Sequence, residues 1–386
     1  MANGRSTCCL ACGGTSIKPV ADLGASPVLT GALFPDRESA RAAVRGPLDL
    51  GLCLTCGHVQ NTAFDPGLVQ YDVNYDNSLH FSGEFQAYAD ALVQRLVGEY
   101  GLRGKHVVEI GSGKGDFLGS LARVGGNTAT GYDPTVEPHT SFPGVTLVQD
   151  YFRPGQHVEP YDLLVCRHVL EHLEDPGELL GALRASAAEA ALFYLEVPAA
   201  EFNFGQDGLW DCIYPHVSYF SAASLATLVR GAGFEIVSLE RSFHGQFLSV
   251  EARAGMPAEA GQSTDGVGEH LDLVADFAER WAGSVEHWRD EVAKRRSRGE
   301  QVALWGAGSK GVNFLTAVDP AGQIPVVDLN PRKAGSHLPG TGHRVDVPES
   351  LAGSAVSTVL ITNPVYRAEI AQRLEQLGVD AEVVPV

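Results

Sequence analysis

Apolar and polar positions alternate along two parts of the chain in a way that predicts strands followed by helices. The first part begins at Lys105 and holds four β-branched or apolar runs with helical stretches between them. These runs are HVVEI (106–110), TATGYD (128–133), YDLLVC (161–166) and ALFYLEV (191–197). Such alternation is typical of a parallel sheet with helices on its faces. We place this α/β domain at residues 71–255.

The second part follows a stretch without periodicity. Residues 253–266 combine Pro, Gly and small polar residues and predict a linker. One helix is expected over 270–296, because apolar residues recur every three or four positions and form one stripe that faces a neighbouring domain. The stripe comprises Leu271, Val274, Phe277, Trp281, Val285 and Trp288. The runs QVALWGAGSKG, IPVVDLN and TVLIT then predict a second α/β unit, which we place at residues 265–386.

Composition narrows the class of protein. With 386 residues, of which 44% are apolar and 19% charged, the chain can bury a core in two or three domains. The formal net charge of −19 opposes binding to nucleic acid, and no basic patch is visible in the sequence. A small anionic substrate remains compatible, because one or two local cations suffice to bind a phosphate.

No apolar run reaches the ~20 residues that a membrane span requires, and the N-terminus lacks a basic segment followed by an apolar one. We therefore expect no membrane partner and a cytoplasmic location. In that reducing compartment, metal binding and catalysis are better explanations for the seven Cys than disulfides.

Two C-x-x-C pairs lie in the Gly- and Pro-rich first part of the chain. Each pair is followed by a glycine, as a metal-binding knuckle prefers, and four thiolates complete a tetrahedral zinc site. The expected ligands are Cys9, Cys12, Cys53 and Cys56. A redox dithiol is the alternative. We predict a structural zinc-binding domain at residues 1–70, with Cys8 as a bystander.

The segment VVEIGSGKGDFL (107–118) predicts a strand, a glycine turn and the start of a helix. Glycines allow close approach of a ligand to the backbone, and the helix N-terminus offers N–H groups to a carboxylate. The spacing E-x-G-x-G-x-G resembles motif I of class I methyltransferases, which bind S-adenosylmethionine, and differs from the dinucleotide fingerprint. This resemblance implies that Glu109, Gly111, Ser112 and Gly113 contact S-adenosylmethionine.

The resemblance extends along the following strands. The second strand ends in GYDP, where Asp133, followed by Pro134, is placed to accept both ribose hydroxyls. In such enzymes the residues matching Asp150, Tyr151 and Phe152 face the adenine. Those matching Arg167 and His168 lie beside the methionine end. Each acidic residue taken alone is better explained as a solvated charge, but their order at strand ends predicts a common ligand site.

Over nearly its whole length the chain resembles the three-domain C-methyltransferases of deoxysugar biosynthesis. The likeness includes the stretches WGAGSKGVNFLTAVD, VVDLNPRKAGSHLPGTGHRV and TNPVYRAEI. It implies a zinc-binding domain, a class I methyltransferase Rossmann-like core and a C-terminal Rossmann-like domain that helps to hold a nucleotide sugar. The fold class is therefore α/β.

The resemblance also implies catalytic residues. In DCIYPHVSYFS (211–221), His216 matches the family's proposed general base, and Tyr75 in NYDNSLHFS matches its catalytic tyrosine. Pro215 stands where the family has an acidic residue, and HGQFLSVEA (244–252) departs from the usual HGGS-R sequence. His172 and Glu171 are weaker candidates, since the VLEH run that contains them is largely architectural.

Four cations are candidate substrate ligands. Lys310 lies in a glycine turn that can bind pyrophosphate, although the turn can also merely pack a helix on its strand. Arg332, Lys333 and Arg367 are secondary candidates that can equally be solvated charges. The leading hypothesis is methylation of the carbon next to a ketone on a nucleotide-linked sugar. O- or N-methylation of another natural-product intermediate and a non-catalytic binding module are the alternatives.

Overall fold

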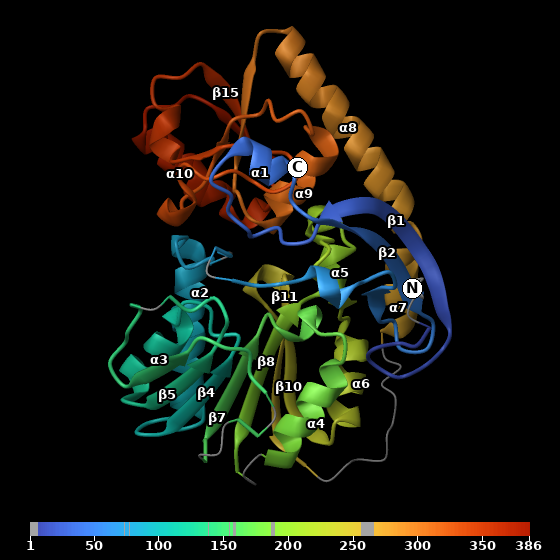
Figure 1. Ribbon diagram of the computed structural model, residues 1–386, viewed down its shortest axis with the longest axis vertical. Helices are drawn as coiled ribbons and strands as arrows, with labels where there is room; N and C mark the ends of the chain where they lie inside the picture. Colours follow the sequence, from blue (N-terminus) through green and yellow to red (C-terminus); the bar gives the residue numbers. More distant parts are fainter. Residues whose placement is uncertain are drawn as a thin grey trace.

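The computed structural model describes residues 7–72, 74–76, 78–137, 139–153, 155–156, 160–186, 190–255 and 266–386. The named strands of this part of the chain form three sheets, which we call the N-terminal, central and C-terminal sheets. In Figure 1 the central sheet occupies the lower half and the C-terminal sheet the upper half. The N-terminal strands lie to one side of both.

The central sheet has seven strands in the order β10-β11-β8-β7-β4-β5-β6. Their bounds are β4 His106–Ile110, β5 Thr128–Tyr132, β6 Val145–Val148, β7 Leu163–Arg167, β8 Leu192–Pro198, β10 Phe234–Ser242 and β11 Phe247–Ala254. The five strands from β4 to β8 are parallel, and the β10–β11 hairpin adds antiparallel strands at the β8 edge. The four predicted runs therefore lie on neighbouring strands.

Helices cover both faces of the central sheet, and a separate apolar core fills each face. These helices are α2 Gly83–Glu99, α3 Asp116–Gly125, α4 Pro176–Ser186 and α6 Ala222–Gly231, whereas the short helix α5 (Ala200–Asn203) lies beyond the strand ends and packs with the N-terminal sheet. Because helices occupy both faces, a ligand has access to the carboxyl ends of the parallel strands.

The C-terminal sheet is parallel throughout, in the order β14-β13-β12-β15-β16. Its strands are β12 Gln301–Trp305, β13 Val326–Val327, β14 Val345–Asp346, β15 Val356–Ile361 and β16 Glu382–Pro385. Helices α9 (Ser309–Val318) and α10 (Arg367–Gln376) belong to this unit. The strand order reverses at β12, so the loops after β12 and β15 form a site where ligands of such sheets bind.

The N-terminal sheet is antiparallel and includes a strand from far along the chain. Strands β1 (Ile17–Pro27), β2 (Arg45–Cys53) and β3 (Val59–Asn61) are followed in the sheet by β9 (Ser218–Tyr219). Val59 pairs with Tyr219, and the Asn61 N–H donates to the Val217 carbonyl at 2.8 Å. The segment after His216 is therefore held by the N-terminal sheet.

The stretch between β1 and β2, which contains α1 (Arg37–Arg41), lies against the C-terminal unit (Figure 1). Arg37 and Arg41 donate to the carbonyls of Ala321 and Pro320 at 2.8 and 3.2 Å. Thr30 donates to the Ser309 hydroxyl at 2.9 Å. The N-terminal residues thus contact both other parts of the molecule.

The single helix expected over 270–296 is wrong in one respect, because it is interrupted at Asp276. Helix α7 spans Val267–Ala275 and α8 spans Phe277–Ser297. At Asp276 the φ and ψ angles are −98° and 10°, which end α7 and begin α8. Val274 and Phe277, on the two sides of this residue, both pack with the N-terminal sheet, whereas Val285 and Trp288, farther along α8, pack with the C-terminal unit. Of the predicted linker over 253–266, residues 256–265 lie outside the described residues.

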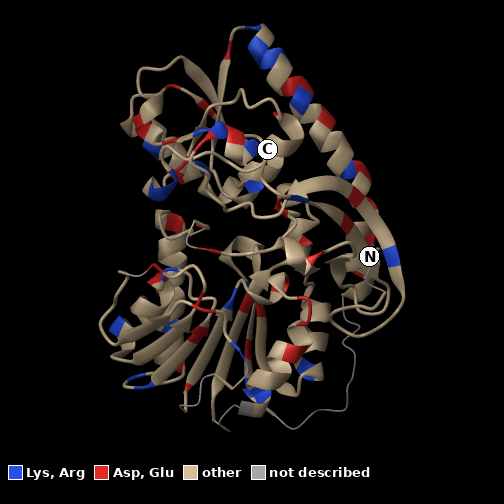
Figure 2. Ribbon diagram, viewed as in Figure 1, with Lys and Arg blue, Asp and Glu red and all other residues tan. Residues whose placement is uncertain are grey.

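Charged residues of both signs are interspersed in the view of Figure 2. Lys294, Arg295 and Arg296 occupy the last turn of α8, where cations complement the helix dipole. Arg295 is paired with Glu291 at 2.8 Å and with Glu382 at 3.4 Å. None of the helices in the described part of the chain has the length and apolar character needed to cross a bilayer.

Candidate active site

A cavity of about 880 Å³ opens between the central and C-terminal sheets. Its lining includes every residue predicted for catalysis and for the methyl donor, except Asp150. Of the predicted substrate ligands, Lys310 and Lys333 line it, and Arg332 and Arg367 do not. The cavity therefore brings together predicted residues that are up to about 260 positions apart in the sequence, from Tyr75 to Lys333.

The glycine turn after β4 has the backbone that its sequence predicts. Gly111 and Gly113 have φ angles of 73° and 54°, which favour glycine. A Cβ at Gly111 would lie 2.2 Å from Cγ2 of Val169, so only glycine fits. The Gly113 N–H donates to Oδ2 of Asp133 at 2.9 Å, which places that carboxylate directly beside the turn.

The same carboxylate also organises its own loop, since Asp133 Oδ1 accepts from the backbone N–H of Thr135 at 2.7 Å. Two further polar atoms at the turn, Oε2 of Glu109 and Oγ of Ser112, are buried without a hydrogen-bond partner in the described structure. Burial raises the pKa of Glu109 to about 8. Buried polar atoms of this kind are ordinarily satisfied, so they suit a cationic ligand that donates hydrogen bonds.

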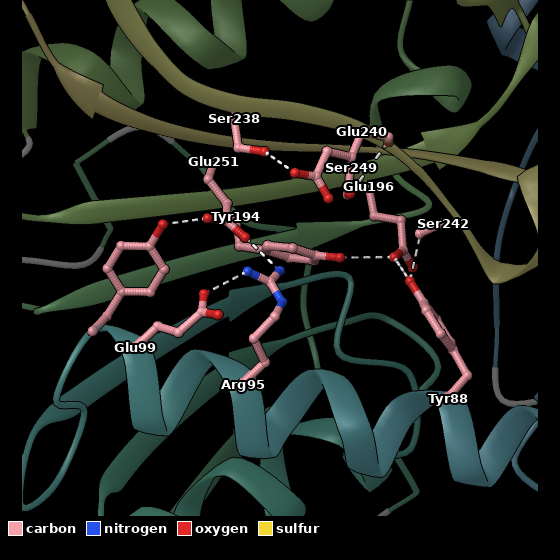
Figure 3. A network of polar contacts seen from close by, with 11 residues as sticks. Tyr88, Arg95, Glu99, Tyr194, Glu196, Ser238, Glu240, Ser242, Ser249 and Glu251 are labelled. Carbon is pink, nitrogen blue, oxygen red and sulfur yellow. Dashed lines mark hydrogen bonds and ion pairs between the residues drawn. The ribbon is translucent and has the colours of Figure 1, made fainter.

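A buried ionic network supports the next strand ends. The Glu196 carboxylate, fully buried at the end of β8, accepts from Nε of Arg167 at 2.9 Å and from the Tyr194 hydroxyl at 2.9 Å. Tyr88 of α2 also donates to it, and Figure 3 shows both tyrosines pointing at Glu196. Arg167 is thereby fixed at the floor of the cavity, with its guanidinium 4.2 Å from the Phe117 ring centre.

His168 lies between two carboxylates. Its Nδ1 is 3.6 Å from Oε1 of Glu171 and its Nε2 is 3.2 Å from Oε1 of Glu196. Desolvation opposes a charge here, but the nearby Glu171 and Glu196 carboxylates outweigh it and raise the pKa of His168 to about 9. Its φ of 55° is rare outside glycine, and such strain is common at functional sites.

The predicted adenine residues diverge in the structure. Tyr151 and Phe152 line the cavity, and the Phe152 ring meets the Tyr132 ring edge-on at 5.3 Å. Asp150 instead accepts from the Tyr151 N–H at 2.8 Å and from Arg153 at 3.3 Å. Its role toward adenine stays a prediction.

The predicted catalytic residues meet above the methyl-donor half of the cavity. The rings of His172 and His216 have centres 4.9 Å apart. Nδ1 of His172 lies 2.8 Å from the Pro215 carbonyl oxygen and 3.0 Å from the Tyr71 hydroxyl. Tyr71 meets Tyr75 edge-on at 4.9 Å. Two imidazoles and two phenols therefore form one cluster.

Burial lowers the pKa of both His172 and His216 to about 4, so both imidazoles are neutral near pH 7. Glu171 completes the group, because donor atoms of Glu171, His172 and His216 all lie within 4.8 Å of one another. Oε1 of Glu171 lies 4.0 Å from Nε2 of His172, whereas two such ligands of one tetrahedral zinc ion lie about 3.4 Å apart.

The C-terminal side of the cavity is joined to the central domain by a polar contact. Oε1 of Gln246 accepts from Lys310 Nζ at 3.1 Å and from Asn363 Nδ2 at 2.9 Å. Lys310 also lies 3.6 Å from the Asp211 carboxylate and 4.7 Å from the Phe202 ring centre. The departure from the HGGS-R sequence thus places an amide beside the predicted substrate cation.

The loop after β12 repeats the arrangement of the loop after β4. The Ala307 N–H donates to Oδ2 of Asp328 at 2.6 Å, and Asp328 follows β13 directly. Lys333 is buried and binds both the Ala307 carbonyl, at 3.2 Å, and Asp328, at 3.3 Å. Arg332 contacts Asp76 at 3.4 Å, and Arg367 begins α10.

The four predicted zinc ligands converge. Sγ of Cys9 lies 3.6 Å from Sγ of Cys56, and Sγ of Cys12 lies 3.7 Å from Sγ of Cys53. All four sulfur atoms are within 4.8 Å of one another. Two thiolates on one tetrahedral zinc ion lie about 3.8 Å apart, so the four residues fit this metal. Zinc bound there contributes folding free energy to the N-terminal sheet.

Comparison with known proteins agrees with this geometry. Residues 9–69 match a family model described as a zinc binding domain, residues 81–239 match a methyltransferase domain, and residues 260–382 match a C-methyltransferase C-terminal domain. The C-methyltransferase NovU of Streptomyces niveus is 27% identical over 385 residues, which cover 94% of this chain and 90% of that protein. The chain belongs to the family of three-domain methyltransferases.

Two further likenesses cover a smaller share of the chain. The ubiquinone biosynthesis O-methyltransferase of Actinobacillus pleuropneumoniae serotype 7 is 31% identical over 99 residues, 22% of this chain and 42% of that protein. Magnesium protoporphyrin IX methyltransferase from Synechocystis, solved with bound S-adenosylhomocysteine, is 19% identical and covers 44% of this chain and 83% of its own, with a TM-score of 0.34.

The predicted fold class is confirmed: a class I methyltransferase core lies between a zinc-binding domain and a C-terminal methyltransferase domain. The protein is an enzyme that uses S-adenosylmethionine, and its four cysteines form the zinc site. Bound S-adenosylmethionine supplies an electrophilic methyl group. Glu109, Asp133 and Arg167 line the cavity at the carboxyl ends of the parallel strands, and their contacts with S-adenosylmethionine stay a prediction.

Several cavity residues were missed by the sequence interpretation. Asp328 had a detectable signal, because Gly306-x-Gly308-x-x-Gly311 follows a strand and an acidic residue ends the next strand about twenty positions later. Asn363 lies in the stretch TNPVYRAEI just after β15, so its place at a strand end was a usable signal. Tyr71 belongs to no such pattern and reaches the cavity only through tertiary packing.

Proposed function

We propose that this enzyme methylates the carbon next to a ketone on a nucleotide-linked sugar. The observation that carries the proposal is the cluster of His216, His172 and Tyr75, because it supplies neutral bases and a phenol between two nucleotide-type half-sites. A carbon acid requires both a base and a hydrogen-bond donor for its enolate oxygen.

The two half-sites support a substrate that carries a nucleotide. In the central domain a loop N–H of Gly113 meets Asp133 at 2.9 Å, and in the C-terminal domain the Ala307 N–H meets Asp328 at 2.6 Å. Carboxylates in this position accept ribose hydroxyls, and the adjoining helix N-terminus favours phosphate. Lys310, in the first turn of α9, is our candidate for the pyrophosphate.

The chemistry follows from the protonation states. The unprotonated imidazole of His216 takes the α-proton, and the electrons of the broken C–H bond form the enolate. Burial raises the pKa of Tyr75, so its phenol stays protonated and donates to the enolate oxygen. The enolate carbon then bonds to the methyl group as the bond from that group to sulfur breaks.

The test measures methyl transfer from labelled S-adenosylmethionine to a panel of keto-sugar nucleotides, phenolic and amine natural-product acceptors, and a blank without acceptor. We expect transfer to a keto-sugar nucleotide, with deuterium exchange at its α-carbon in D₂O in the absence of S-adenosylmethionine. Transfer only to phenols or amines, without exchange, would establish O- or N-methylation instead. That second function is favoured by Pro215 in place of an acid and by Gln246 beside Lys310.

A further inference from the structure

Glu171 is a buried carboxylate in the catalytic cluster, and it has no role in the reaction as proposed above. It belongs to the short helix Leu170–His172, lines the cavity and is 1% exposed. Both of its carboxylate oxygens are buried and lack a hydrogen-bond partner in the described structure. Its Oε1 lies 3.6 Å from Nδ1 of His168 and 4.0 Å from Nε2 of His172.

The contacts of His172 define which of its nitrogens is basic. The Pro215 carbonyl, 2.8 Å from Nδ1, can only accept a hydrogen bond, so Nδ1 carries the hydrogen of the neutral ring. Nε2 therefore holds the lone pair, and it faces Glu171. A proton that arrives at Nε2 creates an imidazolium whose N–H points toward a carboxylate.

The two imidazoles act together, because their centres are only 4.9 Å apart and a proton on one disfavours a proton on the other. Burial also disfavours a proton on either ring. A charge gained in this cluster therefore requires a nearby anion. Pro215 cannot supply one from its side chain.

We propose that Glu171 is the positioning residue of this reaction, whose carboxylate stabilises the positive charge that the His172–His216 pair acquires with the substrate proton. This inference rests on the proposed function. The Glu171 carboxylate thus supplies the negative charge that an acidic residue at position 215 would supply. It lies on the Nε2 side of His172, whereas Pro215 contacts Nδ1. The proton moves from the α-carbon to an imidazole nitrogen, and Glu171 itself neither gains nor loses a proton.

Several titratable and charged groups surround the cluster. His168 is cationic near pH 7 and lies between Glu171 and Glu196. The other titratable and charged groups that act on the cluster are Tyr71, Tyr75 and Asp133 near Glu171, and Asp211 and Lys310 near His216. Glu171 is the one carboxylate among these that directly faces Nε2 of His172.

The kinetic test compares Glu171→Gln and Glu171→Asp with Glu178→Gln, an exposed glutamate on α4. Glu171→Gln should lower kcat by roughly 10- to 100-fold with little change in affinity for S-adenosylmethionine, and Glu171→Asp should recover part of the loss. The acid limb of the kcat/KM profile should move to lower pH by about one unit or more, because the pair loses the anion that favours its protonated form. Glu178→Gln should behave as wild type.

A second readout does not depend on the substrate. Histidine NMR titration of the free enzyme, with resonances assigned from His168→Asn and His172→Asn, should show the pKa of His168 falling in Glu171→Gln. An unchanged acid limb together with an unchanged His168 titration would overturn the inference, even if kcat falls through altered packing. Failure of every keto-sugar nucleotide to exchange its α-hydrogen for deuterium in D₂O would instead overturn the proposed function. The NMR titration would then decide by itself whether Glu171 acts on the neighbouring histidine.

Metal analysis completes the test, because Glu171, His172 and His216 could instead bind an ion. Purified wild type should contain about one zinc per chain, held by the cysteines. A second metal ion that is lost in both Glu171→Gln and His216→Asn would replace the charge-stabilising role with ligation and overturn the inference.

Discussion

Nδ1 of His172 lies 2.8 Å from the carbonyl oxygen of Pro215. Pro215 stands where the resembled enzymes have an acidic side chain. A comparison of side chains alone would therefore indicate that the catalytic cluster has lost an acidic group. The backbone at this position still acts on the catalytic cluster, because its carbonyl fixes the tautomer of His172. Because Nδ1 of His172 already carries a hydrogen, the proton taken from the substrate can go either to the ring of His216 or to Nε2 of His172.

The first prediction concerns the base. His216→Asn retains a polar group of similar shape but cannot accept a proton at neutral pH, so kcat should fall by ~10²–10⁴. Affinity for S-adenosylmethionine, measured by calorimetry, should stay within a few-fold. His287→Asn, on the exposed side of α8, serves as the control. Near-normal turnover of His216→Asn would transfer the role to His172.

The second prediction separates two aspartates assigned to the methyl donor. Asp133→Asn should weaken S-adenosylmethionine binding by ~1.5–3 kcal/mol, the scale of lost hydrogen bonds to a charged group. Asp150→Asn should have less effect, since Asp150 does not line the cavity and contacts Arg153. Equal losses for the two variants would place the Asp150 carboxylate in the site after all.

The third prediction is a pH dependence. Burial raises the pKa of Glu109 to about 8, so this carboxyl is protonated in the free enzyme at pH 7. A cationic ligand beside it favours the ionised form, and binding of S-adenosylmethionine should therefore release a proton. Affinity should rise with pH until about 8 and then level off. Calorimetry in buffers of different ionisation enthalpy measures the release, and Glu109→Gln should abolish it.

The fourth prediction concerns zinc. Cys53→Ser should reduce the metal content from about one zinc per chain toward zero, because three thiolates bind the ion much more weakly than four. The N-terminal sheet should then become susceptible to proteolysis. Cys8→Ser, a change at an exposed neighbour, should keep the metal. Retention of zinc in Cys53→Ser would mean that another residue completes the site.

The fifth prediction compares two helical glycines. A Cβ at Gly311 would lie 2.1 Å from the Gly306 carbonyl oxygen, so Gly311→Ala should destabilise the protein by ~1–3 kcal/mol through forced backbone shifts. Gly283, on α8, has no atom within 4 Å of the same position. Gly283→Ala should therefore stabilise by about 0.5–1 kcal/mol through helix propensity. Denaturant unfolding measures the change in the free energy of unfolding for both variants, and the two changes should have opposite signs.

Local patterns predicted the parts of the fold that depend on local chemistry. The glycine turn at Gly111–Gly113 and the aspartate after the next strand follow from backbone requirements written in adjacent residues, so the methyl-donor half-site could be found without a structure. The four cysteines could be assigned to one zinc site for the same reason, because each C-x-x-C motif is a short run of adjacent residues. Strand β9 could not, because its two residues are a strand only by pairing with β3, some 160 positions earlier.

The catalytic cluster could be predicted in part. His216 and Tyr75 were found through a resemblance, whereas Glu171 and His172 were only weaker candidates because their motif is architectural in that family. The significance of Glu171 depends on the approach of His172 to Pro215, which no spacing in the sequence encodes. The interruption at Asp276 was missed because the apolar stripe continues across it: Val274 and Phe277 lie on its two sides and pack in the same core.

The pairing of β3 with β9 limits how far the N-terminal domain can be exchanged among relatives. The zinc-bound sheet ends on the strand that directly follows His216, so a transplanted domain would meet a foreign edge at the catalytic loop. Chimeras that carry residues 213–220 together with their own N-terminal domain should retain turnover. Chimeras joined near residue 70 alone should still bind S-adenosylmethionine but turn over slowly. The reason is that the pairing of β3 with β9, and not the linker between the domains, sets the position of His216.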